Sequence, residues 1–406
     1  MLPTTAHLPF ADLTKVPRIL EHAEVSLKNK QCRLQCRSAL IPQIDLEKYR
    51  FRAVIDWIEF RVHLGRGTQL QHLQDFLRPF LGRKPFIERE DKSAGDVFSI
   101  CTIKIQEPAS LAHVTVIHQA LIAKYGELAP SCVTGIEISL DAYAKNETAA
   151  LRSLMVGVMQ RTIWTNRDIW TNSNSRPRSI IGMKKVDVFK LLPRPDDIYD
   201  HMTKPTQELC KEPFADGTMY LGAEDDDVMI RVMDKVKDGQ HPHGTFIALT
   251  DQTSRARIEV TLKVAELLRI GLTDIASLRQ FKLTEVQGRY FQFRLPTFAI
   301  RQNPKRTIDV ISNNEEARRA DAYLRSGNLA VMLRDEARLA RWKTLKRRIT
   351  NLTRASGGVS VIKKTSRLST NTFVAYRALD RKVAVAIRHL SAREERAWRK
   401  VTAKVG

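Results

Sequence analysis

The chain has 406 residues, enough for two or three domains built around at least one large core. Its hydrophobic fraction of 43% is ordinary for a globular protein, and no stretch approaches the ~18 apolar residues that a membrane-spanning helix needs. The net charge of +22 is concentrated at one end, because residues 301–406 hold 26 Lys and Arg against 9 Asp and Glu, a net +17. A basic region on a nearly balanced body predicts a polyanionic partner, most often nucleic acid.

The beginning of the sequence and its cysteines predict where the protein works. The segment MLPTTAHLPFADLTKVPRIL has no basic stretch followed by a long apolar run, so no secretory signal is expected. The five cysteines are odd in number and scattered, which predicts free thiols. These features predict a cytoplasmic protein without a membrane partner.

Hydrophobic periodicity predicts alternating strands and helices after a loosely structured N-terminal arm. In chain order, the predicted elements are the arm at 1–48, a strand at 51–64, a helix at 69–80, a strand at 96–106, a helix at 110–126, a strand at 134–145, a helix at 146–160, strands at 217–222, 229–233 and 255–263, and a helix at 264–282. In the first strand, the alternation places Asp56 on the same face as Ile58 and Phe60.

The order of these elements is neither regular βαβ alternation nor all-β. It predicts an α+β fold over residues 51–300, with a mostly antiparallel central sheet flanked by helices. A basic, all-helical C-terminal domain is expected over 301–406. Within that domain, residues Thr370 to Arg377 could open the recognition helix of a helix-turn-helix, or the segment could form a plain helical hairpin.

Acidic side chains stand on or next to three of the predicted strands. They are Glu137, Asp141, Asp234 and Glu259. Carboxylates that converge from neighbouring strands can hold a divalent cation such as Mg²⁺ or Mn²⁺, which polarises a phosphodiester for attack. Arg231 and Arg257 lie on faces suited to binding phosphate. The alternative is a sheet face with cross-strand ion pairs, such as Glu259 with Arg231.

Four segments of the sequence together resemble the replication initiation factor family. They are IDWIEFRV, TGIEISLDAY, GTMYLGAEDDDVMIRVMDK and RARIEVTLK, in the family's order within residues 51–300. The family comprises the rolling-circle initiators of plasmids and filamentous phages, and it is related to nicking relaxases. The resemblance implies metal-dependent nicking of one strand of an origin with single-stranded or cruciform character, in the cytoplasm of a bacterial host. A host helicase and a second copy of the chain are candidate further partners.

The resemblance also assigns roles to individual residues. Glu137, Asp141, Asp234 and Glu259 match positions expected to hold the metal, although Gly135 replaces an arginine, while Arg231 and Lys235 match positions beside the reacting group. The family's strand usually ends in Tyr-Asp-Lys, and its tyrosine attacks DNA and stays joined to the 5′-phosphate. Met233 stands in that place, and a thioether cannot act as this nucleophile.

Three interpretations follow from the methionine. In the first, another tyrosine is the nucleophile. Tyr220 is the nearest candidate, and Tyr143 and Tyr290 are more remote candidates. In the second, the protein resembles initiators and binds DNA without cutting it. In the third, it is an RNA-binding or partner-binding protein with a basic tail. The basic side chains predicted to contact DNA are Arg257, Arg341, Lys343, Lys346, Arg347, Arg348, Lys363, Lys364, Arg367 and Arg377.

Overall fold

The structure is a computed structural model, and it describes residues 2–12, 14–27, 36–83, 85–90, 96–146, 148–165, 178–180, 188–190, 212–239, 246–301, 303–355 and 373–405. Its helices are α1 (Leu70–Leu81), α2 (Leu111–Tyr125), α3 (Ala149–Thr162), α5 (Val264–Arg269), α6 (Leu283–Tyr290), α7 (Thr307–Ser326), α8 (Asn328–Ala355) and α9 (Arg377–Val405).

The strands form two larger sheets and a hairpin. They are β1 (Thr5–Leu8), β2 (Arg18–Ser26), β3 (Ser38–Pro42), β4 (Tyr49–Gln69), β5 (Phe86–Arg89), β6 (Val97–Gln106), β7 (Glu127–Ala144), β8 (Ile163–Trp164), β9 (Arg178–Ile180), β10 (Val188–Lys190), β11 (Thr218–Leu221), β12 (Val228–Lys235), β13 (Lys237–Gly239), β14 (Phe246–Ala248), β15 (Arg255–Lys263), β16 (Gln292–Phe298) and β17 (Phe373–Ala375). The central sheet has the order β10-β9-β11-β12-β15-β7-β4-β6-β5, and each neighbouring pair is antiparallel. The predicted α+β class with a mostly antiparallel central sheet is therefore confirmed.

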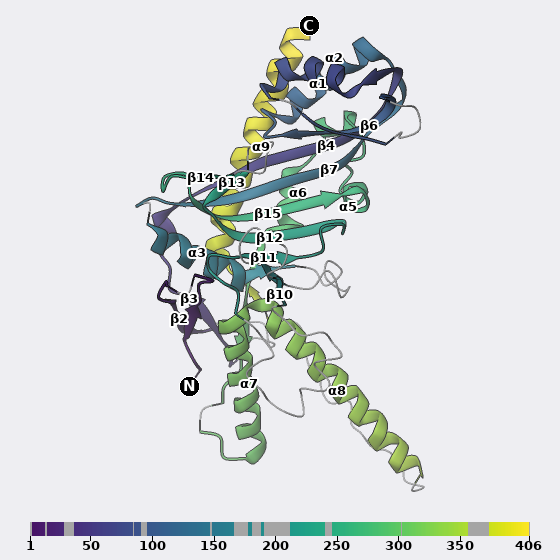
Figure 1. Cartoon of the computed structure of the whole chain (residues 1–406). Helices are drawn as coiled ribbons and strands as arrows, with labels where there is room; N and C mark the ends of the chain where they lie inside the picture. Colours follow the sequence, from purple (N-terminus) through teal and green to yellow (C-terminus); the bar gives the residue numbers. More distant parts are fainter. Residues whose placement is uncertain are drawn as a thin grey trace.

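One face of the central sheet is apolar because the side chains of its strands alternate in phase across the pairing register. Ile138, Val260 and Ile230 lie opposite one another on β7, β15 and β12, and each is fully buried. Helix α3 contacts these three strands, while α2 and α9 contact the neighbouring strand β4, which α9 crosses in Figure 1. The other face carries the charged residues of the same strands, so the alternation that builds the core also builds the candidate site.

Helix α9 belongs to the same core as the sheet, although it comes at the end of the chain. Its buried residues Leu379, Val383, Ile387 and Leu390 recur at spacings that place them on one side of a helix. Glu394 accepts a hydrogen bond from the backbone N–H of Leu111 at the start of α2 (2.7 Å). The core is thus continuous across the predicted domain boundary at residue 301, and that boundary stays a prediction.

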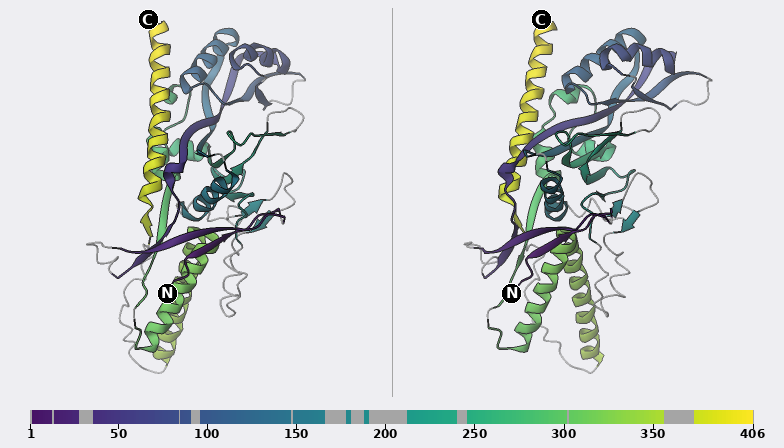
Figure 2. Two further views of the ribbon diagram at one scale, coloured as in Figure 1. Left: turned by 90° about the vertical axis from the view of Figure 1, so that its left-hand side faces the viewer. Right: turned by 60° about the vertical axis from the view of Figure 1, so that its left-hand side comes forward.

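Helices α7 and α8 project from the end of the molecule opposite to α1 and α2, as the views of Figure 2 show. The turn between them is held on α3 by buried donors. The Arg161 guanidinium donates to the carbonyl of Leu324 (2.7 Å), near the C-terminal end of α7, where a positive charge is favoured by the helix dipole. The side-chain amide of Asn328 donates to the carbonyl of Thr162 (2.9 Å). The base of the projecting pair is therefore fixed to the body.

Three predicted elements are wrong. The loosely structured arm instead contributes β1, β2 and β3, which bury Leu8, Leu20 and Leu40 in a sheet completed by β16. The predicted helix at 264–282 ends at Arg269, because Gly271 adopts a left-handed backbone (φ +70°).

The predicted recognition helix is the third. Residues 373–375 form β17, which pairs with β16, and α9 begins only at Arg377. Residues 370–372 lie outside the described part of the chain.

Candidate functional site

The four sequence segments that carry the family resemblance form five neighbouring strands of the central sheet. In sheet order they are β11, β12, β15, β7 and β4. Their register aligns charged and polar side chains in rows on the polar face. One row runs from Tyr220 through Arg231 and Glu259 to Ser139, and the next from Met233 through Arg257 and Asp141 to Arg52. Residues far apart in the sequence thus meet because the strands pair in this order.

Arg231 joins two carboxylates of this face. Its Nη2 lies 2.6 Å from Glu137 Oε2 and 2.6 Å from Glu259 Oε2. The hydroxyl of Thr261 also donates to Glu137 Oε2 (2.5 Å). Burial opposes the charge on Arg231, but the attraction of Glu259 and Glu137 outweighs it and raises the pKa of the guanidinium. The cross-strand pair of Glu259 with Arg231, expected as the alternative to a metal site, is present.

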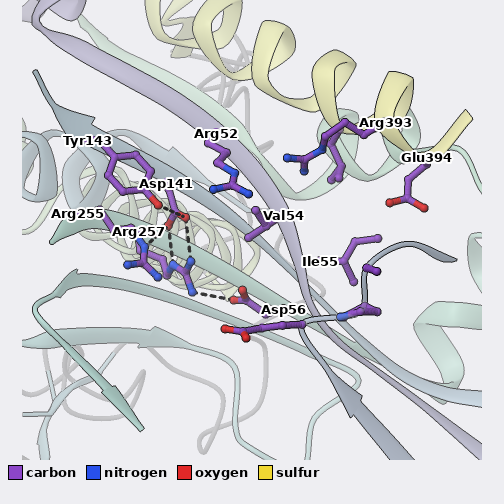
Figure 3. A pocket seen from close by; sticks show the side chains of 14 residues that line it. Arg52, Val54, Ile55, Asp56, Asp141, Tyr143, Arg255, Arg257, Arg393 and Glu394 are labelled. Atoms are coloured by element: carbon purple, nitrogen blue, oxygen red, sulfur yellow. Dashed lines mark hydrogen bonds and ion pairs between the residues drawn. The ribbon is translucent and has the colours of Figure 1, made fainter. Parts of the chain in front are cut away.

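Arg257 compensates the remaining carboxylates, as the dashed lines of Figure 3 show in part. It binds Asp141 through two nitrogens (2.5 and 2.8 Å) and donates from Nη1 to Asp56 (2.9 Å) and Glu259 (3.3 Å). Arg257 is only 5% exposed, and Asp141 is 1% exposed. The donors of Arg257 are thus used inside the sheet face, and its contact with DNA stays a prediction.

Asp56 joins the site because of a bulge that the sequence alternation does not reveal. The register between β4 and β7 shifts between Ile55 and Trp57, which leaves Asp56 as an extra residue. Ile55 and Ile58 are consequently both buried on the apolar face, and Asp56 faces Ser139, whose hydroxyl donates to it. The prediction that Asp56 shares a face with Ile58 is wrong.

The Asp56 carboxyl is harder to ionise than an ordinary aspartate. Burial raises its pKa to about 6, and Glu259 and Glu137 add to this effect, while Arg257 opposes it. Near neutral pH the group is mostly ionised, so it can act as a ligand there. Below about pH 6 its proton competes with any cation.

Three carboxylates are placed well enough to share one cation. Oxygen atoms of Asp56, Glu137 and Glu259 all lie within 4.8 Å of one another. Carboxylate oxygens are the ligands that Mg²⁺ and Mn²⁺ prefer, so the donor set fits such an ion. A bound cation would take over contacts that Arg231 and Arg257 now make. Among the predicted ligands, Glu137 and Glu259 are therefore in the cluster, and Asp141 lies beside it as the partner of Arg257.

Asp234 lies away from this cluster. Strand β12 continues to Lys235, so Asp234 points to the face opposite to Arg231 and Met233. There it forms an ion pair with Arg152 of α3 (2.5 Å). Burial raises the pKa of Asp234, and Arg152 opposes that shift. Its placement among the metal ligands is wrong because the strand is longer than the sequence indicated.

The tyrosines differ in how well they are placed. Tyr220 lies on the polar face of β11, directly across from Arg231. Tyr143 donates to Asp141 (3.3 Å), and burial together with that carboxylate raises its pKa. Tyr290 is buried in α6, where burial and Glu266 raise its pKa. Tyr220 is the one of the three beside the acidic cluster.

The pairing register of β11, β12 and β15 defines the cross-strand neighbours of Met233. Met233 is half-buried and lies between Thr218 of β11 and Arg257 of β15. Two residues further on, Lys235 points to the same face and pairs with Asp238 (3.4 Å).

Gly135, which stands where the family has an arginine, makes room for an aromatic ring. A Cβ at this position would lie 2.8 Å from a ring carbon of Trp57. The ammonium group of Lys104 lies 3.5 Å from the centre of the Trp57 ring. The departure from the family pattern is thus accommodated by packing at the edge of the acidic cluster.

The basic residues predicted to contact DNA fall into distinct groups. Lys343, Arg347 and Arg348 are exposed on α8, and Arg377 is exposed at the start of α9. Arg341 and Lys346 are in the α8 backbone, and their side chains lie outside the described part of the structure. Lys363, Lys364 and Arg367 also lie outside the described residues.

Comparisons with known proteins give little support from sequence. No protein-family model matches the chain, and no curated protein matches it significantly. A solved structure of a rolling circle replication initiator protein from Geobacillus stearothermophilus is similar over 69% of this chain and 98% of that chain, with 9% identity and a TM-score of 0.28. A likeness at this TM-score carries no argument. In the residues described, no helix is long and apolar enough to cross a membrane.

The raised pKa of Asp56 predicts a pH-dependent stability that Asp56→Asn removes. The folded-state pKa of about 6 exceeds the ordinary value of 3.8, so the folded protein holds this proton more tightly than the unfolded chain. Ionisation therefore costs stability as the pH rises from about 4 to about 6, on the order of 1–3 kcal/mol. The measurement is urea unfolding of both proteins at several pH values.

The test compares the free energy of unfolding of the natural protein with that of Asp56→Asn at each pH. The contributions of the other titrating groups cancel in this difference. The natural protein should lose stability relative to the variant across that pH range. Asp75→Asn, which removes an exposed carboxylate of α1, controls for the general loss of a negative charge. Parallel curves for the natural protein and Asp56→Asn would contradict the placement of Asp56.

Proposed function

We propose that this protein is a DNA-binding protein of the replication-initiator type, and that its acidic cluster meets a DNA strand. The observation that carries the proposal is the meeting of the four family-like segments in neighbouring strands, with Glu137, Glu259 and Arg231 on one face. A sheet that serves only as scaffold does not require buried carboxylates and guanidinium groups to be gathered from four strands. Their desolvation is costly, which favours a functional reason for the arrangement.

In this proposal, Asp56, Glu137 and Glu259 would hold one divalent cation, Mg²⁺ or Mn²⁺. When bound, such an ion polarises a phosphodiester and stabilises the charge that develops on its oxygens. Asp141 has a different role, because it holds Arg257 in place through two hydrogen bonds. Released from Glu137 and Glu259, the Arg231 guanidinium could bind a phosphate oxygen beside the cation site.

Tyr220 is the proposed nucleophile if the protein cuts DNA. Its register position across from Arg231 places the phenol at the edge of the cluster. Attack by its oxygen would form a phosphotyrosine bond to the 5′ side and release the 3′-OH of the cut strand. Because Met233 lies at the position where the family has its tyrosine, binding without cutting is the second candidate function.

Helix α8 is the proposed DNA-binding arm. It has 28 residues, which corresponds to about 42 Å, and it extends away from the sheet (Figure 1). The exposed side chains of Lys343, Arg347 and Arg348 present positive charge along it. Phosphate contacts from such residues give affinity that is independent of sequence and depends on salt.

Replacing Lys343, Arg347 and Arg348 together by Gln should weaken binding to single-stranded DNA at all sequences. Each lost phosphate contact removes about 0.7–0.9 from the slope of log affinity against log salt, so a total flattening of about 2–3 is expected. Fluorescence anisotropy at several salt concentrations measures it. These point variants are preferable to removing residues 301–406, because that truncation would also expose the core that α9 covers.

A matched control removes the same number of exposed charges from the body, through Arg66→Gln, Arg279→Gln and Lys282→Gln. It should leave the slope close to that of the natural protein. An equal flattening in both triple variants would show that only the overall charge matters. A competition experiment between the DNA and RNA of the same sequence tests the RNA-binding alternative. That alternative requires the RNA to bind more tightly than the DNA.

Met233→Tyr should form a covalent adduct with single-stranded DNA in the presence of Mg²⁺ or Mn²⁺. The new phenol would stand two residues along the strand from Arg231 and opposite Arg257, where a cation held by the cluster would favour its ionised form. The readout is an SDS-stable, protease-sensitive band on labelled DNA. Met233→Phe supplies a ring without a hydroxyl and is the control.

The natural protein decides between the two candidate functions in the same assay. An adduct that Tyr220→Phe abolishes would establish cutting by Tyr220. DNA binding without an adduct, in both the natural protein and Met233→Tyr, would leave the binding-only function. Absence of DNA binding altogether would overturn the proposal.

A further inference from the structure

A pocket of about 400 Å³ lies beside the first half of β4, between that strand and α9 (Figure 3). Strand β6 pairs with β4 only from Trp57 onward, so no strand of the described residues pairs with this stretch of β4 on that side. Four arginines from three elements line the pocket: Arg52 of β4, Arg255 and Arg257 of β15, and Arg393 of α9. The volume is in the range of small-ligand sites, roughly 300–1,000 Å³.

Among the described residues, the acidic side chains around the pocket form ion pairs with two of these four arginines, Arg255 and Arg257. Glu394 is occupied as the acceptor for the backbone N–H of Leu111 (2.7 Å). Glu107 pairs with Arg83 (3.2 Å), and both side chains are exposed. Asp141 and Asp56 both bind Arg257, and the same Asp141 carboxylate lies 3.2 Å from the Nε of Arg255.

Arg52, Arg255 and Arg393 are less fully compensated than Arg257, because Arg255 shares the Asp141 carboxylate with Arg257 and the other two form no ion pair among the described residues. Arg52 forms no hydrogen bond or ion pair with any residue that the structure describes. Arg255 donates to the carbonyl of Thr253 (2.8 Å), and its buried Nε lies 3.2 Å from Asp141 Oδ1 without forming a hydrogen bond there. Arg393 donates from one nitrogen to the carbonyl of Ala53 (2.8 Å).

Like charges are therefore held together at the pocket. Burial lowers the pKa of Arg393, and the neighbouring charge of Arg52 lowers it further. Arg255 is kept in position by Tyr143, whose ring centre lies 5.8 Å from its guanidinium carbon, with Arg50 over the same ring at 4.7 Å. In Figure 3 the guanidinium groups of Arg52 and Arg393 lie close together above Asp56. An anion with several acceptor oxygens would relieve this repulsion.

We propose that the pocket binds a phosphate group through Arg52, Arg255 and Arg393. Guanidinium groups match the oxygens of phosphate in paired hydrogen bonds, and three of them from separate elements can surround one group. The group could belong to a free 5′-mononucleotide or to the backbone of a DNA strand, since both carry the same anion. The proposal goes beyond the DNA-binding function, because none of the three arginines belongs to the acidic cluster or to α8.

The test measures binding of thymidine 5′-monophosphate and of pyrophosphate by isothermal titration calorimetry. The double variant Arg52→Gln with Arg393→Gln should weaken both by at least about tenfold, which is the effect of losing one charge-assisted contact. Arg388→Gln is the matched control: it removes an exposed arginine of the same helix, whose Nε binds only the carbonyl of Ala384. It should leave both affinities unchanged.

A second arm separates the two sources of phosphate. A short single-stranded oligonucleotide without terminal phosphates is added in competition with thymidine 5′-monophosphate. Displacement that the double variant abolishes assigns the pocket to backbone phosphate, and the absence of displacement assigns it to a mononucleotide or a terminal phosphate. Either result supports the pocket as a phosphate site.

The proposal is overturned if the natural protein binds neither probe, or if the double variant binds both as well as the natural protein does. Thermal unfolding of each variant confirms that it is folded. Because the probes include pyrophosphate and a mononucleotide, the result is independent of whether α8 binds DNA or Tyr220 cuts it. Failure of the DNA-binding function and failure of the phosphate pocket are thus distinguishable.

Discussion

Charge compensation on the polar face of the central sheet is the constraint on which the rest of the structure depends. The pairing of β4, β7 and β15 brings Asp56, Glu137 and Glu259 within reach of one another, with Asp141 beside them as the partner of Arg257. Without Arg231 and Arg257 they would repel one another in a region where water cannot screen them. Loss of one partner from such a buried pair leaves an uncompensated charge and typically costs about 3–5 kcal/mol. The two arginines are thus structural requirements as well as candidate binding groups.

This arrangement links the two regions proposed to contact nucleic acid. Asp56 belongs to the acidic cluster and also lines the arginine-rich pocket beside α9. A phosphate in that pocket would therefore lie next to the carboxylates that fit a cation. Helix α8 is fixed to α3 through Asn328, the end of α7 is fixed to α3 through Arg161, and α3 is in turn tied to β12 by Arg152 and Asp234. The projecting helices and the central sheet are consequently both held by α3.

The sequence predicts the parts of the site that depend on strand alternation. The period of two places Glu137, Glu259 and Arg231 on one face, and the structure confirms it. It could not predict Asp56, because a bulge changes the phase of a strand and becomes visible only when the partner strand is known. The position of Asp234 is hidden from the sequence for a related reason: β12 has two more residues than the alternation indicates, so the side chain turns to the opposite face and meets Arg152.

Predictions that depend on contacts between distant segments were less successful. The N-terminal residues form strands because β3 pairs with β16, about 260 residues further along the chain. The tail gains β17 by pairing with the same strand, which excludes the recognition helix there. The spacing of apolar residues in α9 predicts an amphipathic helix. That this helix packs on β4 is known only from the structure. Local patterns thus predict the elements, and long-range pairing decides their boundaries and partners.

The most direct test of the central claim is a crystal structure of the protein grown with Mn²⁺ above pH 7, where Asp56, with its pKa of about 6, is ionised. The claim is that the acidic cluster is a site for a cation beside phosphate rather than a closed ion-pair network. It predicts an anomalous-scattering peak between Asp56, Glu137 and Glu259, with the Arg231 guanidinium moved away from Glu137 and Glu259. No peak, with Arg231 still between those two carboxylates, would contradict it.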